Sequence, residues 1–86
     1  MKRAAIISAI LDDPRTSQRA FNEIVHDYNA IVRGRMGIPF DKGNVALIAL
    51  TVVGEMDMIN GFTGKLGRIK GVTVKASFSP ESVQTE

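Results

Sequence analysis

The sequence predicts an α+β domain in which four strands form one antiparallel sheet and two helices cover one of its faces. The 86 residues suffice for one small domain. Apolar segments with strand or helix period follow one another in the order strand, helix, strand, strand, helix, strand. The middle two strands form a hairpin and each helix makes a crossover, which gives a ferredoxin-like βαββαβ sandwich. We expect a single domain over residues 1–79 and a polar tail over residues 80–86.

The first strand and the first helix occupy residues 4–29. The run AAIISAIL fits a helix or a strand by period alone, but its length favours a strand buried on both faces. Asp13 is placed to cap a helix with Pro14 at its first position, and Thr16 and Ser17 are alternative caps. The helix is predicted to end near Asn29, since apolar residues recur at helical spacing: Ala20, Phe21, Ile24, Val25 and Tyr28.

The segment GRMGIP, at residues 34–39, belongs to the second predicted strand, over residues 31–38. Alternation places Val32, Gly34, Met36 and Ile38 on one face and Ile31, Arg33, Arg35 and Gly37 on the other. We expect Pro39 to end the pairing. FDKGN is then the hairpin connection, in which Gly43 is free to adopt a positive φ.

The third predicted strand, residues 44–53, is apolar on both faces, and Gly54 breaks the run. Two helices cover only one side of the sheet, so the other side would expose a large apolar patch formed by the first and third strands. A second subunit packed there would cover it. We therefore expect a homo-oligomer, a dimer or a tetramer.

The second helix and the last strand complete the fold. The helix is predicted from Glu55 to about Leu66, although Gly61 and Gly64 each weaken it by about 1 kcal/mol relative to alanine. Gly67 is its expected C-terminal stop. Residues 72–78 alternate between apolar and polar side chains, as an edge strand does.

Composition limits the function classes. The chain has no cysteine and one histidine, so it cannot supply a thiolate site or a multi-histidine metal site by itself. We expect no metal and no cofactor. No apolar run approaches the roughly 18 residues of a membrane span, so we expect a cytoplasmic protein with no membrane partner.

Few residues could carry catalysis. GFTGKLG, at residues 61–67, lacks the spacing of a phosphate-binding loop, and Leu66 stands where such a loop has Ser or Thr. His26 fits a surface histidine near a helix C-terminus. Asp12 and Asp13 could form a carboxylate pair, but capping is the simpler role. No nucleophile, base and oxyanion site assemble, so we do not expect an enzyme.

Two groups of residues are candidates for recognition. The first lies at the first strand-to-helix turn and on the second strand, where a small anionic effector such as an amino acid, or a subunit interface, could be recognised: Asp13, Thr16, Ser17, Arg33, Gly34, Arg35 and Gly37. The second is basic and lies in the acid-free stretch 58–80: Lys65, Arg68, Lys70 and Lys75. A solvated face and a phosphate-contacting patch both fit this second group.

GRMGIP, TGKLGRIKGVTVK and the segment FNEIVHDYNAIVRGRMGIPF carry a family resemblance. The chain resembles the iron-only hydrogenase system regulators over residues 3–79. The resemblance implies a ferredoxin-like, ACT-like fold related to the C-terminal domain of the nickel-responsive repressor, and a regulatory role. We expect the repressor's metal site not to carry over, because this chain has one histidine and no cysteine, and we expect no counterpart of its DNA-binding segment ahead of the first predicted strand.

Three hypotheses follow. The leading one is a non-enzymatic, ACT-like module in transcription regulation that binds a small effector or a partner protein as an oligomer. The second is a regulator that binds DNA directly through the basic stretch Lys65 to Lys75. The third is a small enzyme that uses Asp12, Asp13 or His26.

Overall fold

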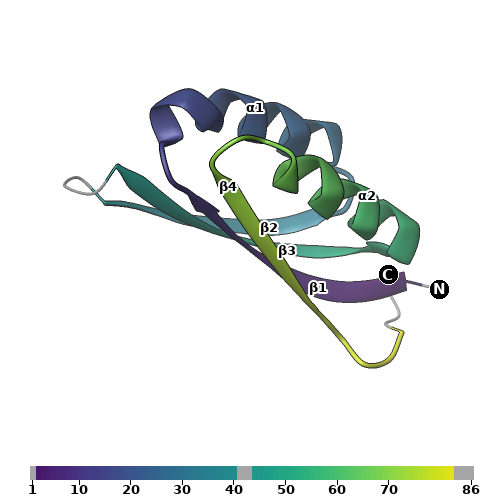
Figure 1. The fold of residues 1–86 in the computed structure, drawn as a ribbon. Helices are drawn as coiled ribbons and strands as arrows, with labels where there is room; N and C mark the ends of the chain where they lie inside the picture. Colours follow the sequence, from purple (N-terminus) through teal and green to yellow (C-terminus); the bar gives the residue numbers. More distant parts are fainter. Residues whose placement is uncertain (1, 41–43, 83–86) are drawn as a thin grey trace.

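The computed structural model describes residues 2–40 and 44–82 and has the predicted order of elements (Figure 1). The strands are β1 (Lys2–Leu11), β2 (Val32–Phe40), β3 (Val45–Glu55) and β4 (Val72–Phe78). The helices are α1 (Pro14–Asp27) and α2 (Met56–Gly67).

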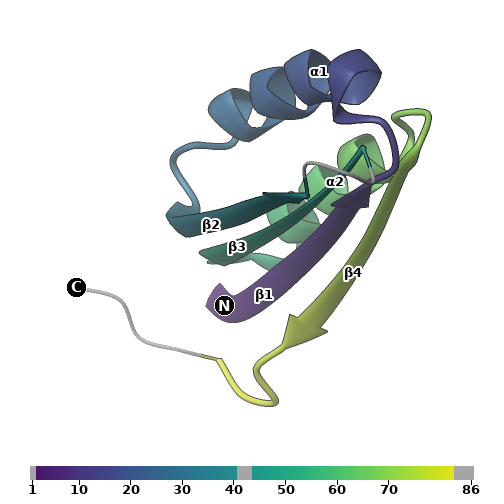
Figure 2. The same cartoon turned by 90° about the vertical axis from the view of Figure 1, so that its left-hand side faces the viewer.

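The four strands form one antiparallel sheet in the order β2-β3-β1-β4. Both helices lie on the same side of this sheet, and the other side is open in both views (Figures 1 and 2). This arrangement is the ferredoxin-like βαββαβ sandwich, so the predicted fold class is confirmed. We call the side under the helices the inner face and the opposite side the outer face.

The hydrophobic core lies between the inner face and the helices. Alternate residues of β1 and β3 point inward, and Ile7, Leu11 and Leu50 are fully buried. The helices contribute Phe21 from α1 and, from α2, side chains at helical spacing: Ile59, Phe62 and Leu66. Tyr28, just after α1, stacks on Phe62 with ring centroids 4.8 Å apart. The two helices therefore share one core with the sheet.

The second strand differs from the predicted alternation because it contains a β-bulge. Val32 pairs with Val52 and Gly34 with Thr51, so Arg33 is an extra residue in β2. Val32 therefore lies on the inner face with Arg35 and is separated from Gly34, which lies on the outer face. The prediction that Val32 and Gly34 share a face is wrong, since alternation assumes an uninterrupted pleat.

The ends of several elements also differ from the predictions. Pro39 does not end the pairing, because β2 lies at the sheet edge and Pro39 still pairs with Ala46. Gly54 does not break β3, which continues to Glu55. Gly54 leaves room for Ile31, whose Cγ2 would lie 2.8 Å from an added Cβ.

Two predictions concerned glycines at turns, Gly43 in the hairpin connection and Gly67 at the end of the second helix. The predicted role of Gly43 lies outside the described residues, and the positive φ next to it, 50°, belongs to Asn44. Gly67 is the last residue of α2 instead of its stop, and the positive φ in the connection after this helix belongs to Gly71, where it is 81°.

Candidate functional site

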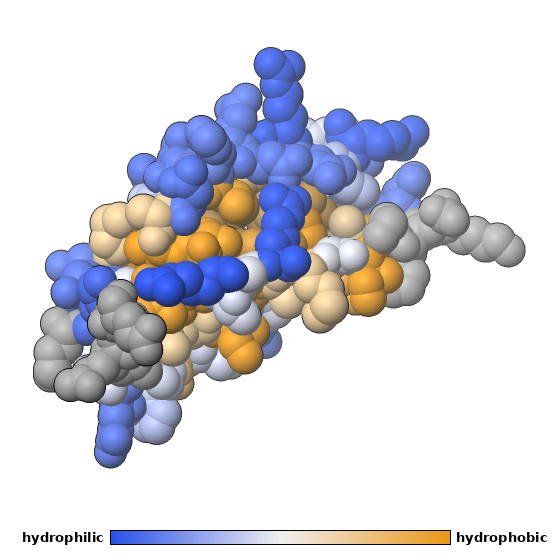
Figure 3. Space-filling model, turned by 180° about the vertical axis from the view of Figure 1, so that it is seen from behind, coloured by the Kyte–Doolittle hydropathy of each residue, from blue (hydrophilic) through white to orange (hydrophobic). Residues whose placement is uncertain are grey.

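The outer face of the sheet is the most hydrophobic exposed surface among the described residues. Among the described residues, six large hydrophobic side chains are exposed. Five of them lie on the outer face: Ile6 (56%), Ile10 (41%), Met36 (67%), Ile38 (53%) and Leu47 (38%). The sixth, Met58, lies on α2. Seen from behind, hydrophobic surface lies below the hydrophilic helix layer and is crossed by a few long hydrophilic side chains (Figure 3). The expectation of an uncovered apolar face on the first and third strands is therefore confirmed, and β2 extends it.

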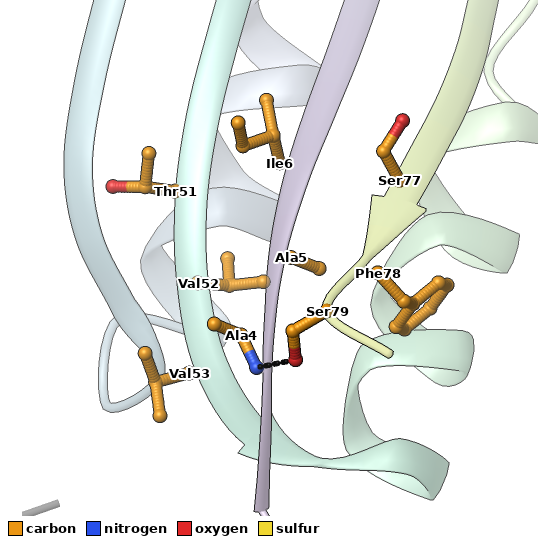
Figure 4. Close-up of a pocket in the computed structure, with 9 residues that line it drawn as sticks. All are labelled: Ala4, Ala5, Ile6, Thr51, Val52, Val53, Ser77, Phe78 and Ser79. Carbon is orange, nitrogen blue, oxygen red and sulfur yellow. Dashed lines mark hydrogen bonds between the residues drawn. The ribbon is translucent and has the colours of Figure 1, made fainter. Parts of the chain in front are cut away.

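Two shallow apolar hollows mark this part of the sheet. One, of about 300 Å³, is lined by residues of β1, β2 and β3, including Ser8, Ile10, Leu47 and Ala49. The other, of about 380 Å³, lies where β1 begins and β4 ends (Figure 4). There the Ala4 N–H donates a hydrogen bond of 3.2 Å to the Ser79 hydroxyl oxygen, which holds the chain after β4 against β1. Neither hollow offers a cluster of charged groups for a polar ligand.

Polar groups in the first turn of α1 form hydrogen bonds with one another. Asp13 occupies the N-cap position and Pro14 the first helical position, as predicted, but the Asp13 carboxylate makes no capping hydrogen bond. Instead the Asp13 carbonyl oxygen accepts hydrogen bonds from the hydroxyls of Thr16 and Ser17, both at 3.0 Å, and from their backbone N–H groups. The Asp13 Oδ1 lies 3.5 Å from the Arg15 Nε. These amides and hydroxyls are thus already used within the turn.

The candidates on β2 divide between the two faces. Arg35 and Gly37 pair with the buried residues Leu50 and Ile48 and therefore lie on the inner face, whereas Gly34 lies on the outer face. Arg35 donates a 2.7 Å hydrogen bond to the Asn22 side-chain oxygen and lies over the Phe21 ring, 5.7 Å from its centroid. The expectation that Arg33 and Arg35 share one regular face is wrong, because Arg33 is the extra residue of the bulge.

One cavity does bring the start of α1 and the second strand together. It has a volume of about 220 Å³ and lies between α1 and the β2–β3 edge, with these lining residues: Pro14, Gln18, Arg35, Gly37, Ile38, Ala46 and Ile48. Of the seven predicted candidates only Arg35 and Gly37 line it. A Cβ added at Gly37 would be in ordinary van der Waals contact, 3.6 Å from Ile48 Cγ1 and 3.7 Å from the Leu47 carbonyl oxygen, without a clash.

The four basic residues do not form one surface. Lys65 lies in the last turn of α2, with its Nζ 5.2 Å from the centre of the Tyr28 ring. Arg68 and Lys70 are exposed in the connection that follows α2. Lys75 lies on β4 opposite Ser8, and both belong to the outer face. The cations are therefore divided between the helix layer and the opposite side of the sheet.

The histidine considered for catalysis lies at the opposite end of α1 from Asp12 and Asp13. His26 is exposed in the last turn of α1, and the Asp12 N–H donates a 2.8 Å hydrogen bond to the Gly71 carbonyl oxygen. Within residues 2–40 and 44–82, no group of three or more His, Asp or Glu side chains is placed to hold a metal ion. Over the same residues, no helix has the length and apolar character needed to cross a membrane.

Met36 and Ile38 contribute to the apolar outer face, and this contribution was not predicted from the sequence. GRMGIP was expected to serve backbone approach and recognition, and these two side chains were not counted as part of the apolar surface. The alternation from Gly34 to Ile38 could have identified them, because residues two apart in a strand share a face.

Comparison with solved structures first establishes the fold. The C-terminal domain of the MgtC protein from Mycobacterium tuberculosis has a TM-score of 0.66 at 15% identity, with 98% of this chain and 94% of that chain covered. A formyltetrahydrofolate deformylase from Pseudomonas putida KT2440 has a TM-score of 0.60 at 9% identity, with 86% of this chain and 28% of that one covered. At these identities the likeness extends to the fold alone.

The family follows from a nearer relative and from a family model. The uncharacterized protein TM1266 from Thermotoga maritima is similar over 91% of this chain and 98% of its own, with 33% identity and a TM-score of 0.87. None of the curated proteins compared with the chain matches it. The family model described as "TM1266-like: Iron-only hydrogenase system regulator, putative" matches residues 3–76. The chain therefore belongs to the TM1266-like family of iron-only hydrogenase system regulators.

Proposed function

We propose that this protein is a non-enzymatic regulatory module of an iron-only hydrogenase system and that it acts as a homo-oligomer. The regulatory role rests on the family to which the chain belongs. The oligomer rests on a single structural observation, the five large hydrophobic side chains exposed on the outer face of the sheet.

The distribution of these side chains supports a second copy as the covering partner. A hydrophobic patch of this extent on a small soluble domain marks an interaction surface. Homodimer interfaces are richer in apolar area than transient ones, and the three strands β2, β3 and β1 offer a surface of that kind. A domain of 86 residues is also marginal when it folds alone, so burial against a partner subunit would add stability.

The regulatory role can be tested in a host that carries an iron-only hydrogenase system and lacks this protein. Wild type and Leu47→Lys are supplied at equal levels, and hydrogenase activity and hydrogenase transcript levels are measured. Leu47 lies on the outer face, so a lysine there should prevent assembly without entering the core. We expect wild type to change the hydrogenase readouts and Leu47→Lys to lose that effect.

Two other results would each reject one part of the proposal. If neither protein changes hydrogenase activity or transcripts, the regulatory role is wrong. If Leu47→Lys regulates as well as wild type while it sediments as a monomer, the oligomer is not the working form.

A small anionic effector is a second candidate, supported by the 220 Å³ cavity beside α1. Because the first turn of α1 uses its own donors, the contact to an anion would come from the Arg35 guanidinium, and Gly37 leaves space beside it. A small carboxylate such as an amino acid fits this chemistry.

The effector is tested by a thermal-shift screen of amino acids and other small anions on wild type, Arg35→Gln and Arg33→Gln. Arg33 does not line the cavity, so Arg33→Gln is the matched control. We expect a ligand that raises the melting temperature of wild type and of Arg33→Gln, and that has no effect on Arg35→Gln. If no ligand in a broad screen stabilises wild type, the cavity is not an effector site.

A further inference from the structure

The outer face has a relief that fits a second copy in one orientation. We propose that two copies pack outer face against outer face, with β2 of one copy over β2 of the other. In this arrangement a ridge on each copy enters a groove on the other. The proposal rests on the homo-oligomer proposed above and specifies its geometry.

The ridge and the groove follow from the register of the sheet. Ile38, Leu47 and Ile10 are opposite one another on β2, β3 and β1, and form a row of large side chains across the strands. The neighbouring row has the small residues Ala49 and Ser8 in its centre. All these side chains point away from the same face of the sheet, and large side chains project farther than small ones. The first row is therefore a ridge, and the centre of the second row is a groove.

The 300 Å³ hollow on the outer face is this groove. Ser8 and Ala49 form its floor, while the ridge residues and Met36 form its walls. Its lining is almost entirely apolar side chain, which suits an apolar side chain and offers nothing to a charged ligand. The central ridge residue, Leu47, is of the size and chemistry to enter it.

The proposed two-fold axis lies between the two facing sheets, runs perpendicular to the strands and passes midway between the two rows. Rotation by 180° about this axis brings a ridge and a groove together at two places. It places the ridge of the first copy over the groove of the second, and the ridge of the second over the groove of the first. Two-fold interfaces require such self-complementarity, and packed sheets interdigitate their facing side chains in this way. With this axis each strand lies over the same strand of the partner.

The fourth strand excludes the other simple orientation. On the outer face β4 carries only polar side chains, Thr73, Lys75 and Ser77. A half-turn about an axis along the strands would place β4 over β2 and press Lys75 against Met36 and Ile38. Burial of an unpaired ammonium group against apolar side chains is unfavourable. With the axis across the strands, Lys75 stays at the rim, where its ammonium group remains in water.

The size of the outer face fits a dimer. Four strands about 4.8 Å apart and about nine residues long, at about 3.3 Å per residue, cover roughly 570 Å² in projection. Projecting side chains make the accessible area larger than the projection, and stable interfaces bury about 800 Å² per partner. The face is therefore large enough for one partner sheet.

Single-cysteine cross-linking tests the orientation, and the chain is suited to it because it contains no cysteine. We compare Met36→Cys on β2, Lys75→Cys on β4 and, as a collision control, Glu23→Cys, which is exposed on α1. Each is treated with a short bismaleimide, alone and as an equal mixture of the first two. We expect Met36→Cys and Lys75→Cys each to form covalent dimers with themselves, and Glu23→Cys to stay monomeric.

The remaining outcomes separate this geometry from the oligomer itself. Covalent dimers formed only in the mixture would show β2 over β4 and overturn the proposed orientation, while the oligomer would stand. A protein that sediments as a dimer without cross-links at either cysteine would overturn the outer-face interface. A wild type that sediments as a monomer, without cross-links, would overturn both the geometry and the oligomer, and a different partner would then have to cover the face.

Discussion

The two faces of the sheet are built from the same strands, yet they differ in what covers them. In β1, Ile7 points to the inner face and is fully buried under the helices, whereas its neighbour Ile6 points to the outer face and is 56% exposed. In β3, Leu50 and Leu47 repeat the contrast. In these two pairs the residue types are the same on both sides of the sheet, and only their burial differs, because the helices cover the inner face and leave the outer face exposed (Figure 1).

Buried apolar residues can stabilise both the fold of a single chain and its association with a partner. In this protein we expect the two effects to come from different faces of the sheet. Residues of the inner face should control the free energy of unfolding of one chain. Residues of the outer face should control association, with little effect on the isolated chain. The following variants test that separation.

The largest difference is expected between Ile7→Ala and Ile6→Ala. Loss of the buried Ile7 side chain should lower the free energy of unfolding by about 2–5 kcal/mol, because it leaves a cavity in the core. Ile6→Ala should change the stability of the isolated chain by less than about 1 kcal/mol. Urea unfolding at two protein concentrations measures both, since association makes the midpoint depend on concentration. Equal losses for both variants at the lower concentration would refute the separation.

Leu47→Lys should weaken self-association by about 2 kcal/mol or more, which is roughly a 30-fold rise in the Kd of the oligomer. The lysine would be buried without a partner in the interface, whereas in the isolated chain it would point to water. Sedimentation velocity measures the association, and circular dichroism checks that the fold is kept. A Leu47→Lys variant that keeps the wild-type sedimentation coefficient would place the interface elsewhere.

Substitution of one glycine on each face, Gly54 and Gly34, compares how well the two faces tolerate an added methyl group. An added Cβ would lie 2.8 Å from Ile31 Cγ2 at Gly54 and 2.8 Å from Thr51 Oγ1 at Gly34. Ile31 is packed in the core, so Gly54→Ala should cost about 1–3 kcal/mol. Thr51 is exposed and can rotate, so Gly34→Ala should cost less than about 1 kcal/mol. Thermal unfolding of both variants checks the order, and the reverse order would contradict it.

The smallest effect is expected at the polar strand. Lys75→Gln should change stability by less than about 0.5 kcal/mol, because Lys75 is exposed on the edge strand. If β4 lies at the rim, the Kd of the oligomer should change by less than about threefold. A large loss of association on this substitution, measured by the same sedimentation experiment, would show that β4 lies inside the interface.

Much of the fold could be predicted from the sequence because period and length separate its elements. The doubly apolar run of β3 and the helical spacing of Phe21 and Val25 were sufficient. The bulge at Arg33 could not be predicted, since it depends on how β2 meets β3. For the same reason Arg35 was expected beside Arg33 on one face, and its contact with Asn22 from α1 was not foreseen.

The candidate site was predicted less well than the fold. The uncovered face follows from hydrophobic pattern alone, and it was expected on the first and third strands. The effector candidates depended on free donors at the start of α1, and sequence could not show that the Asp13 carbonyl oxygen engages Thr16 and Ser17. Short-range hydrogen bonds of this kind are decided by local geometry.

Sedimentation equilibrium of the wild-type protein at micromolar concentration measures whether the chain self-associates, as the proposed outer-face interface requires. One chain has a mass of 9.3 kDa. We expect a mass of two chains or an even multiple, with dissociation only on strong dilution, because the proposed interface buries the outer face against a second copy. A single species of 9.3 kDa throughout the micromolar range would contradict it.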